Sequence, residues 1–233
     1  MIDLHSHILP GIDDGCKDEE EAIEVLKTMR KNGTEVLALT PHFRYGKDSV
    51  EFFIHKRGEV YDNLLRAIEE SGAEVPKLVL GAEVRYFDSI ADAHMLEALC
   101  YEKSRFILIE MPFAKWSRDM LVELNNITVR KGIVPVVAHV NRYLKYGNKL
   151  DDIADLRIPM QINAEVFESF FSKRKWLKVV EKYKSVVLGS DCHNSTTRAP
   201  NLHIAEAEVM RSCERRTIHY IKKTEKLILG LAN

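Results

Sequence analysis

The sequence predicts a parallel α/β barrel, and three observations favour this fold. Short runs rich in β-branched residues alternate with longer amphipathic stretches, and no linker or low-complexity segment interrupts them. Histidine, aspartate or glutamate follows nearly every predicted strand. In a barrel these strand ends share one face, whereas an open sheet concentrates functional residues at one switch point. No glycine-rich turn typical of nucleotide binding follows a strand, so an open nucleotide-binding sheet has no support.

The predicted strands are short apolar segments that end in polar residues. Their alternation with helices implies parallel strands joined by helical crossovers, in about seven strand–helix units. The strands are expected in MIDLHSH, EVLALTPH, KLVLGAE, RFILIE, IVPVVAH, at about 158–163, and in SVVLGSDCH.

The predicted helices carry apolar residues at helical spacing. The first, at 18–32, has acidic residues in its first turn and basic residues in its last, as the helix dipole favours. Its apolar face consists of Ala22, Val25, Leu26 and Met29. Further helices are expected at about 48–71, 88–100, 117–131, 149–156, 166–183, 199–212 and 215–230.

The length and charge limit the class of protein. A chain of 233 residues can bury a substantial core as one domain, so a single barrel domain is expected over 1–233, with the C-terminal helices of about 199–230 packed on it. Lys plus Arg (34) nearly balances Asp plus Glu (35), and the net charge is −1. Proteins that neutralise phosphate backbones are usually more basic, so nucleic acid is not expected as a partner.

A cytoplasmic location without membrane insertion is expected. The N-terminus lacks the basic and apolar regions of a signal peptide, and the candidate site already begins at His5. No run of about 18 apolar residues is present. The cysteines lack paired CxxC spacing, which favours free thiols in a reducing compartment. They are Cys16, Cys100, Cys192 and Cys213.

Two ligand pairs have the spacing that chelation by a strand requires. Residues i and i+2 of a strand face the same side, so His5 and His7 can bind a single ion. Asp191 and His193 repeat this spacing at the last strand, and the two pairs become neighbours if the barrel closes. The alternative for each pair alone is a set of partly buried residues hydrogen-bonded to loops.

Further ligand-type residues end the intervening strands: His42, Glu83, Glu110 and His139. A carboxylate that ends an apolar strand is costly unless it is paired, coordinated or protonated. Beside convergent histidines, bridging of two cations explains both glutamates more economically than surface exposure. Of Asp13 and Asp14, only one need be a ligand, and the other can organise the turn before Gly15.

These motifs, in order from residue 1 to about 200, resemble a known superfamily. HSHILPGIDDG, TPHF, GAEVR, LIEMPF, PVVAHVNR and GSDCHN are similar to the PHP (polymerase and histidinol phosphatase) superfamily. Within it they most resemble the bacterial metal-dependent protein tyrosine phosphatases of capsule and exopolysaccharide operons. The resemblance implies a distorted, TIM-like (β/α)7 barrel that holds three divalent metal ions, with manganese favoured and iron or zinc as alternatives.

The resemblance also implies the site residues. The metal ligands would be His5, His7, Asp14, His42, Glu83, Glu110, His139, Asp191 and His193. Arg142 and Arg198 match the arginines that would hold the phosphate oxygens. Asn141 departs from the glutamate usual in the family, and the continuation of the QINAEV segment has no assigned role.

The implied activity is hydrolysis of phosphotyrosine on a protein. Metal coordination lowers the pKa of water towards about 7, and a phenolate leaves more readily than an alkoxide. The implied partner is the tyrosine kinase that regulates capsular or exopolysaccharide synthesis. Alternatives are a small-molecule phosphatase of the histidinol-phosphate type, a phosphodiesterase or nuclease, and an inactive binding module.

A second phosphatase signature overlaps the last strand end. Cys192 and Arg198 satisfy the Cys-x5-Arg spacing of cysteine-dependent tyrosine phosphatases. The segment lacks the glycine that lets such a loop turn tightly, and Asp191 beside the thiol would raise its pKa. The metal-dependent mechanism is therefore preferred.

Overall fold

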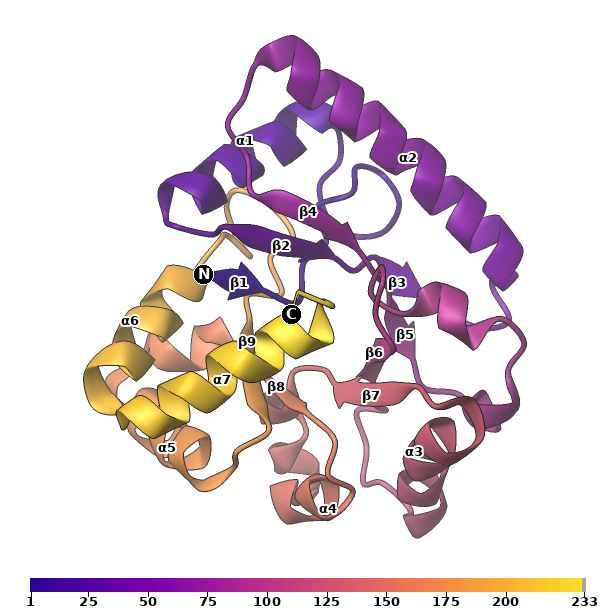
Figure 1. Ribbon diagram of the computed structural model, residues 1–233, viewed down its shortest axis with the longest axis vertical. Helices are drawn as coiled ribbons and strands as arrows, with labels where there is room; N and C mark the ends of the chain where they lie inside the picture. The colour runs from indigo at the N-terminus through magenta and orange to yellow at the C-terminus, as the bar shows by residue number, and fades with distance from the viewer. Residues whose placement is uncertain (232–233) are drawn as a thin grey trace.

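The computed structural model describes residues 1–231, and its strands run parallel inside a layer of helices (Figure 1). The ends of the strands, where the ligand-type residues lie, form one face. The strands are β1 (Ile2–Asp3), β2 (Val36–Leu39), β3 (His42–Phe43), β4 (Lys77–Leu80), β5 (Glu83–Arg85), β6 (Phe106–Glu110), β7 (Val134–Val137), β8 (Met160–Asn163) and β9 (Val186–Gly189).

The strands follow chain order around a ring. They form two parallel sheets, in the orders β1-β2-β4 and β3-β5-β6-β7-β8-β9. Two residues separate β2 from β3 and β4 from β5, so the first sheet continues into the second. Beyond β9, the parallel bridge between Ser6 and Cys192 and the 2.8 Å hydrogen bond from His7 N to Cys192 O lead back to the chain after β1. The arrangement agrees with the parallel α/β fold expected from the sequence.

The helices that follow the strands cover the ring from outside, and α1 and α2 lie over β2 and β4 (Figure 1). The helices are α1 (Glu19–Lys31), α2 (Val50–Ser71), α3 (Arg118–Lys131), α4 (Leu150–Asp155), α5 (Phe170–Lys182), α6 (Leu202–Ser212) and α7 (Arg215–Ile228). Within residues 1–231, no helix combines the length and apolar character needed to cross a membrane.

The last helix closes the interior of the ring. Ile228 and Leu229, at the end of α7, pack with Ile2, Val136 and Val187 from three strands. The Ser104 hydroxyl donates to Ile228 O at 2.5 Å. The C-terminal helices therefore pack on the barrel over the described residues, and residues 232–233 of the expected domain lie outside them.

Two expected helices differ from the structure. Residues 88–100 form two 3-10 turns, η1 (Ile90–Asp92) and η2 (Leu96–Leu99), so the prediction of one helix was wrong. Ser89 and Met95 before these turns have φ of 63° and 56°, which is incompatible with a continuous right-handed helix. The expected helix at 166–183 is divided, because Ser169 is extended between η5 (Ala164–Phe167) and α5.

Candidate metal centre

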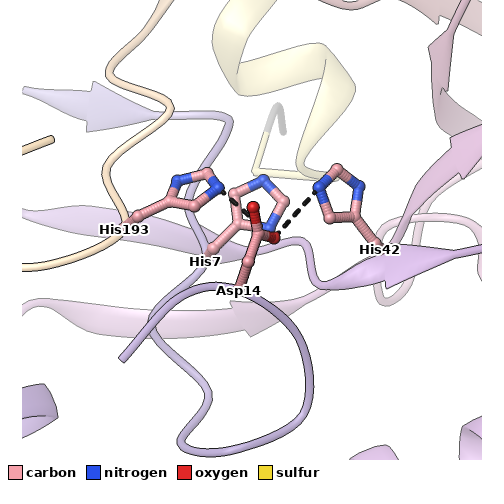
Figure 2. A group of neighbouring side chains, drawn as sticks. All are labelled: His7, Asp14, His42 and His193. Carbon is pink, nitrogen blue, oxygen red and sulfur yellow. Dashed lines mark ion pairs between the residues drawn. The ribbon is translucent and has the colours of Figure 1, made fainter. Parts of the chain in front are cut away.

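All the ligand residues expected from the sequence lie together at the carboxyl ends of the strands. His5, His7, His139 and Asp191 are buried, whereas Asp14 lies on the loop after β1 with its side chain 61% exposed. In Figure 2 the side chains of His7, Asp14, His42 and His193 point toward one another although three separate segments supply them. The fold thus brings side chains from three distant segments into one polar cluster.

The cluster contains three groups of side chains whose ligand atoms lie within 4.8 Å of one another. The groups are His7, Asp14, His42 and His193; His5, His7 and Glu83; and Glu83, Glu110 and His139. His7 belongs to the first two groups and Glu83 to the last two. A residue shared by two such groups lies where it would contact two cations if both groups held one.

Asp191 lies between the histidines of the first strand end. Its Oδ1 is 3.5 Å from Nε2 of His5 and 3.5 Å from Nε2 of His7. Glu83 faces the same two nitrogens, with Oε1 and Oε2 each 3.4 Å away. Two buried carboxylates therefore face two buried imidazoles across one small volume.

The hydrogen bonds of His5 and His7 leave their inner nitrogens free to bind a cation. Nδ1 of His7 donates to Asp13 Oδ2 at 2.7 Å, and Nδ1 of His5 donates to Gln161 Oε1 at 3.0 Å. The two Nε2 atoms face each other 3.1 Å apart. At that distance they need a positive charge between or beside them, either a shared proton or a cation, so the donor set fits divalent cations.

The electrostatics of the cluster also favour positive charge. Burial alone would lower the pKa of His7, but hydrogen bonds to Asp13 and Glu83 outweigh it and raise the pKa to about 10. Burial opposes ionisation of Glu83, whereas the surrounding histidines hold its pKa well below the usual range. Nδ1 of His42 lies 2.9 Å from Glu83 Oε2 without a hydrogen bond to any described residue, as expected where both atoms face a shared cation.

A layer of polar side chains behind the ligands fixes their orientation. Gln161 Oε1 also accepts from His139 N at 2.7 Å, while its Nε2 donates to Asn163 Oδ1 at 2.9 Å. Asn163 Nδ2 in turn donates to Asp191 Oδ2 at 2.9 Å. One chain of amides on β8 therefore links ligands from β1, β7 and β9.

This layer contains residues that the sequence did not assign. Gln161 and Asn163 belong to the QINAEV segment, and their i,i+2 spacing was the available signal. Asn141 accepts from Asn163 N at 3.0 Å and donates to Glu165 at 3.2 Å, so it supports the layer rather than the cluster itself. Asp13 organises the turn by accepting from Gly15 N, and its bond to His7 was not anticipated.

Two of the expected ligand residues occupy a backbone conformation that is rare outside glycine. His139 has φ of 29° after β7, and Asp191 has φ of 56° after β9. Such positions cost on the order of 1–3 kcal/mol each and concentrate at functional sites. The left-handed turn directs both side chains into the cluster at the point where their strands end.

The two expected arginines converge on one carboxylate at the edge of the cluster. Nη2 of Arg142 lies 2.9 Å and Nη2 of Arg198 2.6 Å from Asp191 Oδ2. Both line a cavity of about 460 Å³ together with Glu165 and Thr197. A second cavity, of about 380 Å³, lies on the other side of the cluster beside His42. A larger hollow of about 940 Å³ runs along the outside of α1, away from these residues.

Cys192 is placed away from the open face of the site. It is 1% exposed, packs with Cys16 and Ile8, and donates its thiol toward Asn194 O. Burial, together with nearby carboxylates, raises the pKa of this thiol well above its usual range. Cys192 is thus a core side chain, and its thiol is not placed to act as the nucleophile of the Cys-x5-Arg mechanism. The four cysteines are free.

Comparison with known proteins shows the same architecture and family. Residues 1–228 match the family described as "Capsular polysaccharide synthesis, CpsB/CapC". The chain is 30% identical over 219 residues to tyrosine-protein phosphatase CpsB of Streptococcus pneumoniae, with 88% of each chain covered. It is 28% identical to tyrosine-protein phosphatase YwqE of Bacillus subtilis (strain 168), covering 89% of this chain and 82% of that one.

The fold likewise matches a solved structure. The chain superposes with a TM-score of 0.84 and 22% identity on a solved structure. That structure is described as belonging to "Crystal structures of YwqE from Bacillus subtilis and CpsB from Streptococcus pneumoniae, unique metal-dependent tyrosine phosphatases". The match covers 100% of this chain and 96% of that chain. The overall fold of the chain is therefore that of this structure.

Proposed function

The chain belongs to the CpsB/CapC family of capsular polysaccharide synthesis, and from that premise we propose that it is a metal-dependent phosphatase of phosphotyrosine in proteins. The observation that carries the proposal is the sharing of His7 and Glu83 among three ligand groups, with two arginines at the edge of the cluster. Adjacent cations and guanidinium donors together are suited to binding and hydrolysing a phosphate monoester.

The proposed ligands are His5, His7, Asp14, His42, Glu83, Glu110, His139, Asp191 and His193, which would hold three divalent ions. Cations held there would supply a water of lowered pKa and would neutralise charge on the phosphate. Manganese is the proposed ion, and the mixed imidazole and carboxylate donors also suit iron or zinc.

The arginines would bind the phosphate oxygens. Arg142 and Arg198 already direct N–H groups to a single oxygen of Asp191, so their charges are aligned before substrate arrives. Nη1 of Arg198 also donates to His193 Nε2 at 2.6 Å, a hydrogen bond that a cation on this nitrogen would replace. Loading of the site would then release part of the guanidinium group for the substrate.

An aromatic ring at the mouth favours an aryl phosphate. Phe113 is 42% exposed and stacks on the His139 ring, with centroids 5.8 Å apart and planes at 16°. A tyrosine ring attached to a bound phosphate can pack against the open part of Phe113. Such a contact has no counterpart in a short alkyl phosphate.

The family supports a proposal about the biological partner. We propose that the substrate is the autophosphorylated tyrosine kinase that regulates capsular or exopolysaccharide synthesis, and that the reaction takes place in the cytoplasm. CpsB and YwqE, the two relatives described above, are named tyrosine-protein phosphatases, and the family name refers to capsular polysaccharide synthesis.

The test is phosphate release from a phosphotyrosine peptide and from the matched phosphoserine peptide. The proposal predicts turnover of the phosphotyrosine peptide alone, loss on chelation and recovery with manganese. Chelator-resistant turnover would contradict the metal mechanism. Turnover of small alkyl phosphates without turnover of either peptide would indicate a small-molecule phosphatase instead.

A further inference from the structure

We propose that the cavity beside His42 is a second substrate site that binds a carboxylate of an acidic residue close to the phosphotyrosine. This inference rests on the proposed function and adds to it a preference among peptides. The cavity, of about 380 Å³, is lined by Arg44, Lys47 and Lys56 together with Phe52 and His42. We call it the basic cavity.

The basic cavity adjoins the place where the phosphate would bind. His42 and Asp14 contribute to its wall and also belong to the first ligand group, with His42 Nε2 3.3 Å from Asp14 Oδ1. An extended peptide advances about 3.3–3.6 Å per residue. A side chain one or two residues from the phosphotyrosine can therefore reach this cavity while the phosphate occupies the metal centre.

The cations of the basic cavity lack fixed partners. Within residues 1–231, no carboxylate lies within ion-pair distance of Arg44, Lys47 or Lys56. Arg142 and Arg198, in contrast, both pair with Asp191. The difference means that the arginines belong to the reaction centre, whereas the charges of the basic cavity remain available for an incoming anion.

The acidic residues that share the wall do not cancel this charge. Asp13 is committed to His7 and to the turn at Gly15, and Asp14 faces His42 in the ligand cluster. Asp48 is the remaining acid of the lining, against three cations. The excess of positive charge selects an anionic rather than a neutral or basic side chain.

The loop that carries two of these cations is held in place. The Tyr45 ring stacks on Phe87 with centroids 4.1 Å apart and planes at 8°, and Lys47 N donates to Arg44 O at 3.1 Å. Lys56 is supplied separately by α2. The backbone that carries the cations is thus held in place on two elements before substrate binds, which reduces the entropy lost on binding.

The experiment compares kcat/KM for two phosphotyrosine peptides that differ by Glu or Gln at the positions within two residues of the phosphotyrosine. It uses the manganese-loaded full chain, the single variants Arg44→Gln, Lys47→Gln and Lys56→Gln, and the triple variant. Lys77→Gln is the matched control. Lys77 is exposed and begins β4, so it lies at the end of the strand that is opposite to the metal centre and the basic cavity. A small aryl phosphate, 4-nitrophenyl phosphate, reports the chemistry without flanking residues.

The wild type should prefer the Glu peptide by about two- to 25-fold at low salt, as expected for two exposed ion pairs of about 1.4- to 5-fold each. The triple variant should lose the preference, and Lys77→Gln should keep it. Salt of about 1 M should suppress it, because the Debye length falls to about 3 Å. Turnover of 4-nitrophenyl phosphate should stay within about twofold in every variant.

Equal kcat/KM for the Glu and Gln peptides in the wild type would overturn the inference, as would a preference that persists in the triple variant. Both results leave the proposed function intact, because each peptide is still hydrolysed. Failure of the manganese-loaded wild type to hydrolyse either peptide or 4-nitrophenyl phosphate would instead overturn the proposed function itself.

Discussion

The carboxylate of Asp13 lies 2.7 Å from Nδ1 of His7 and so determines which nitrogen of this imidazole faces the ligand cluster. An ionised carboxylate only accepts hydrogen bonds, so Nδ1 carries a proton and Nε2 is the nitrogen that faces the cluster. His7 belongs to two of the three ligand groups. Asp13, which is not among the proposed ligands, therefore orients a histidine that is proposed to bind two ions.

Asp13→Ala should weaken manganese binding by about 10–100-fold, the usual cost of losing a partner behind a metal-bound histidine. Asp13→Asn should weaken manganese binding less, because its amide oxygen can still accept the hydrogen bond from Nδ1 of His7. Titration of the metal-free protein with manganese, followed by calorimetry, measures the effect. Unchanged affinity in Asp13→Ala would show that the Asp13–His7 hydrogen bond does not support the site.

Arg198→Ala should lower kcat by about 10²–10³-fold while the bound metal stays at the wild-type level. The reason is that Arg198 directs its charge to the edge of the cluster and is not among the ligands. Arg198→Lys should recover part of the loss, since it keeps the charge without the planar pair of donors. Metal analysis alongside kinetics decides the matter, and loss of metal in Arg198→Ala would contradict a role in phosphate binding.

Cys192→Ser should retain wild-type turnover within about twofold. Its thiol is buried, and burial raises its pKa, so it neither reaches the substrate nor ionises readily. The measurement is phosphate release from a phosphotyrosine peptide with manganese present. An inactive variant that still contains its metals would restore the cysteine mechanism.

Glu225 on α7 should make the folded state less stable as pH rises. Burial, reinforced by Asp3, raises the pKa of Glu225 to about 7, and the nearest cation, Lys222, lies 3.9 Å away. The folded protein then binds more protons than the unfolded chain between about pH 4.5 and 7. The stabilisation that protonated Glu225 gives to the folded state is therefore fully present below about pH 4.5 and is lost as the pH rises to about 7. The loss is on the order of 1–3 kcal/mol.

The comparison with Glu225→Gln isolates this effect. The free energy of unfolding of both proteins is measured by urea denaturation at pH 5 and pH 8. Between pH 5 and pH 8 the wild type should lose about 1–3 kcal/mol of stability relative to Glu225→Gln. Parallel pH profiles for the two proteins would contradict it.

The positions of the proposed ligand residues were predictable because they depend on local pattern. His5 with His7 and Asp191 with His193 have the spacing that places two side chains on one side of a strand, and the apolar runs before Glu83 and Glu110 mark where strands end. The strand order then follows from the alternation of strands with helices. No knowledge of side-chain contacts is needed for this step.

The supporting layer was not predictable in the same way. Gln161 and Asn163 acquire their roles because β8 lies between β7 and β9, which brings His139 and Asp191 within hydrogen-bonding distance. Residues 88–100 have helical spacing, but Ser89 and Met95 adopt positive φ, so the backbone follows its tertiary setting instead of local propensity. In both cases the deciding partners are distant in the chain.

The shared ligand Glu83 provides the most direct test of the account. Glu83 belongs to two ligand groups and Glu110 to one, although both are carboxylates at strand ends. After dialysis against manganese, elemental analysis should find about three ions per chain in the wild type, one fewer in Glu110→Gln and at least two fewer in Glu83→Gln. Phosphate release from a phosphotyrosine peptide should be lost with the ions of Glu83→Gln. A Glu83→Gln protein that keeps both the wild-type metal content and the wild-type turnover would contradict the account.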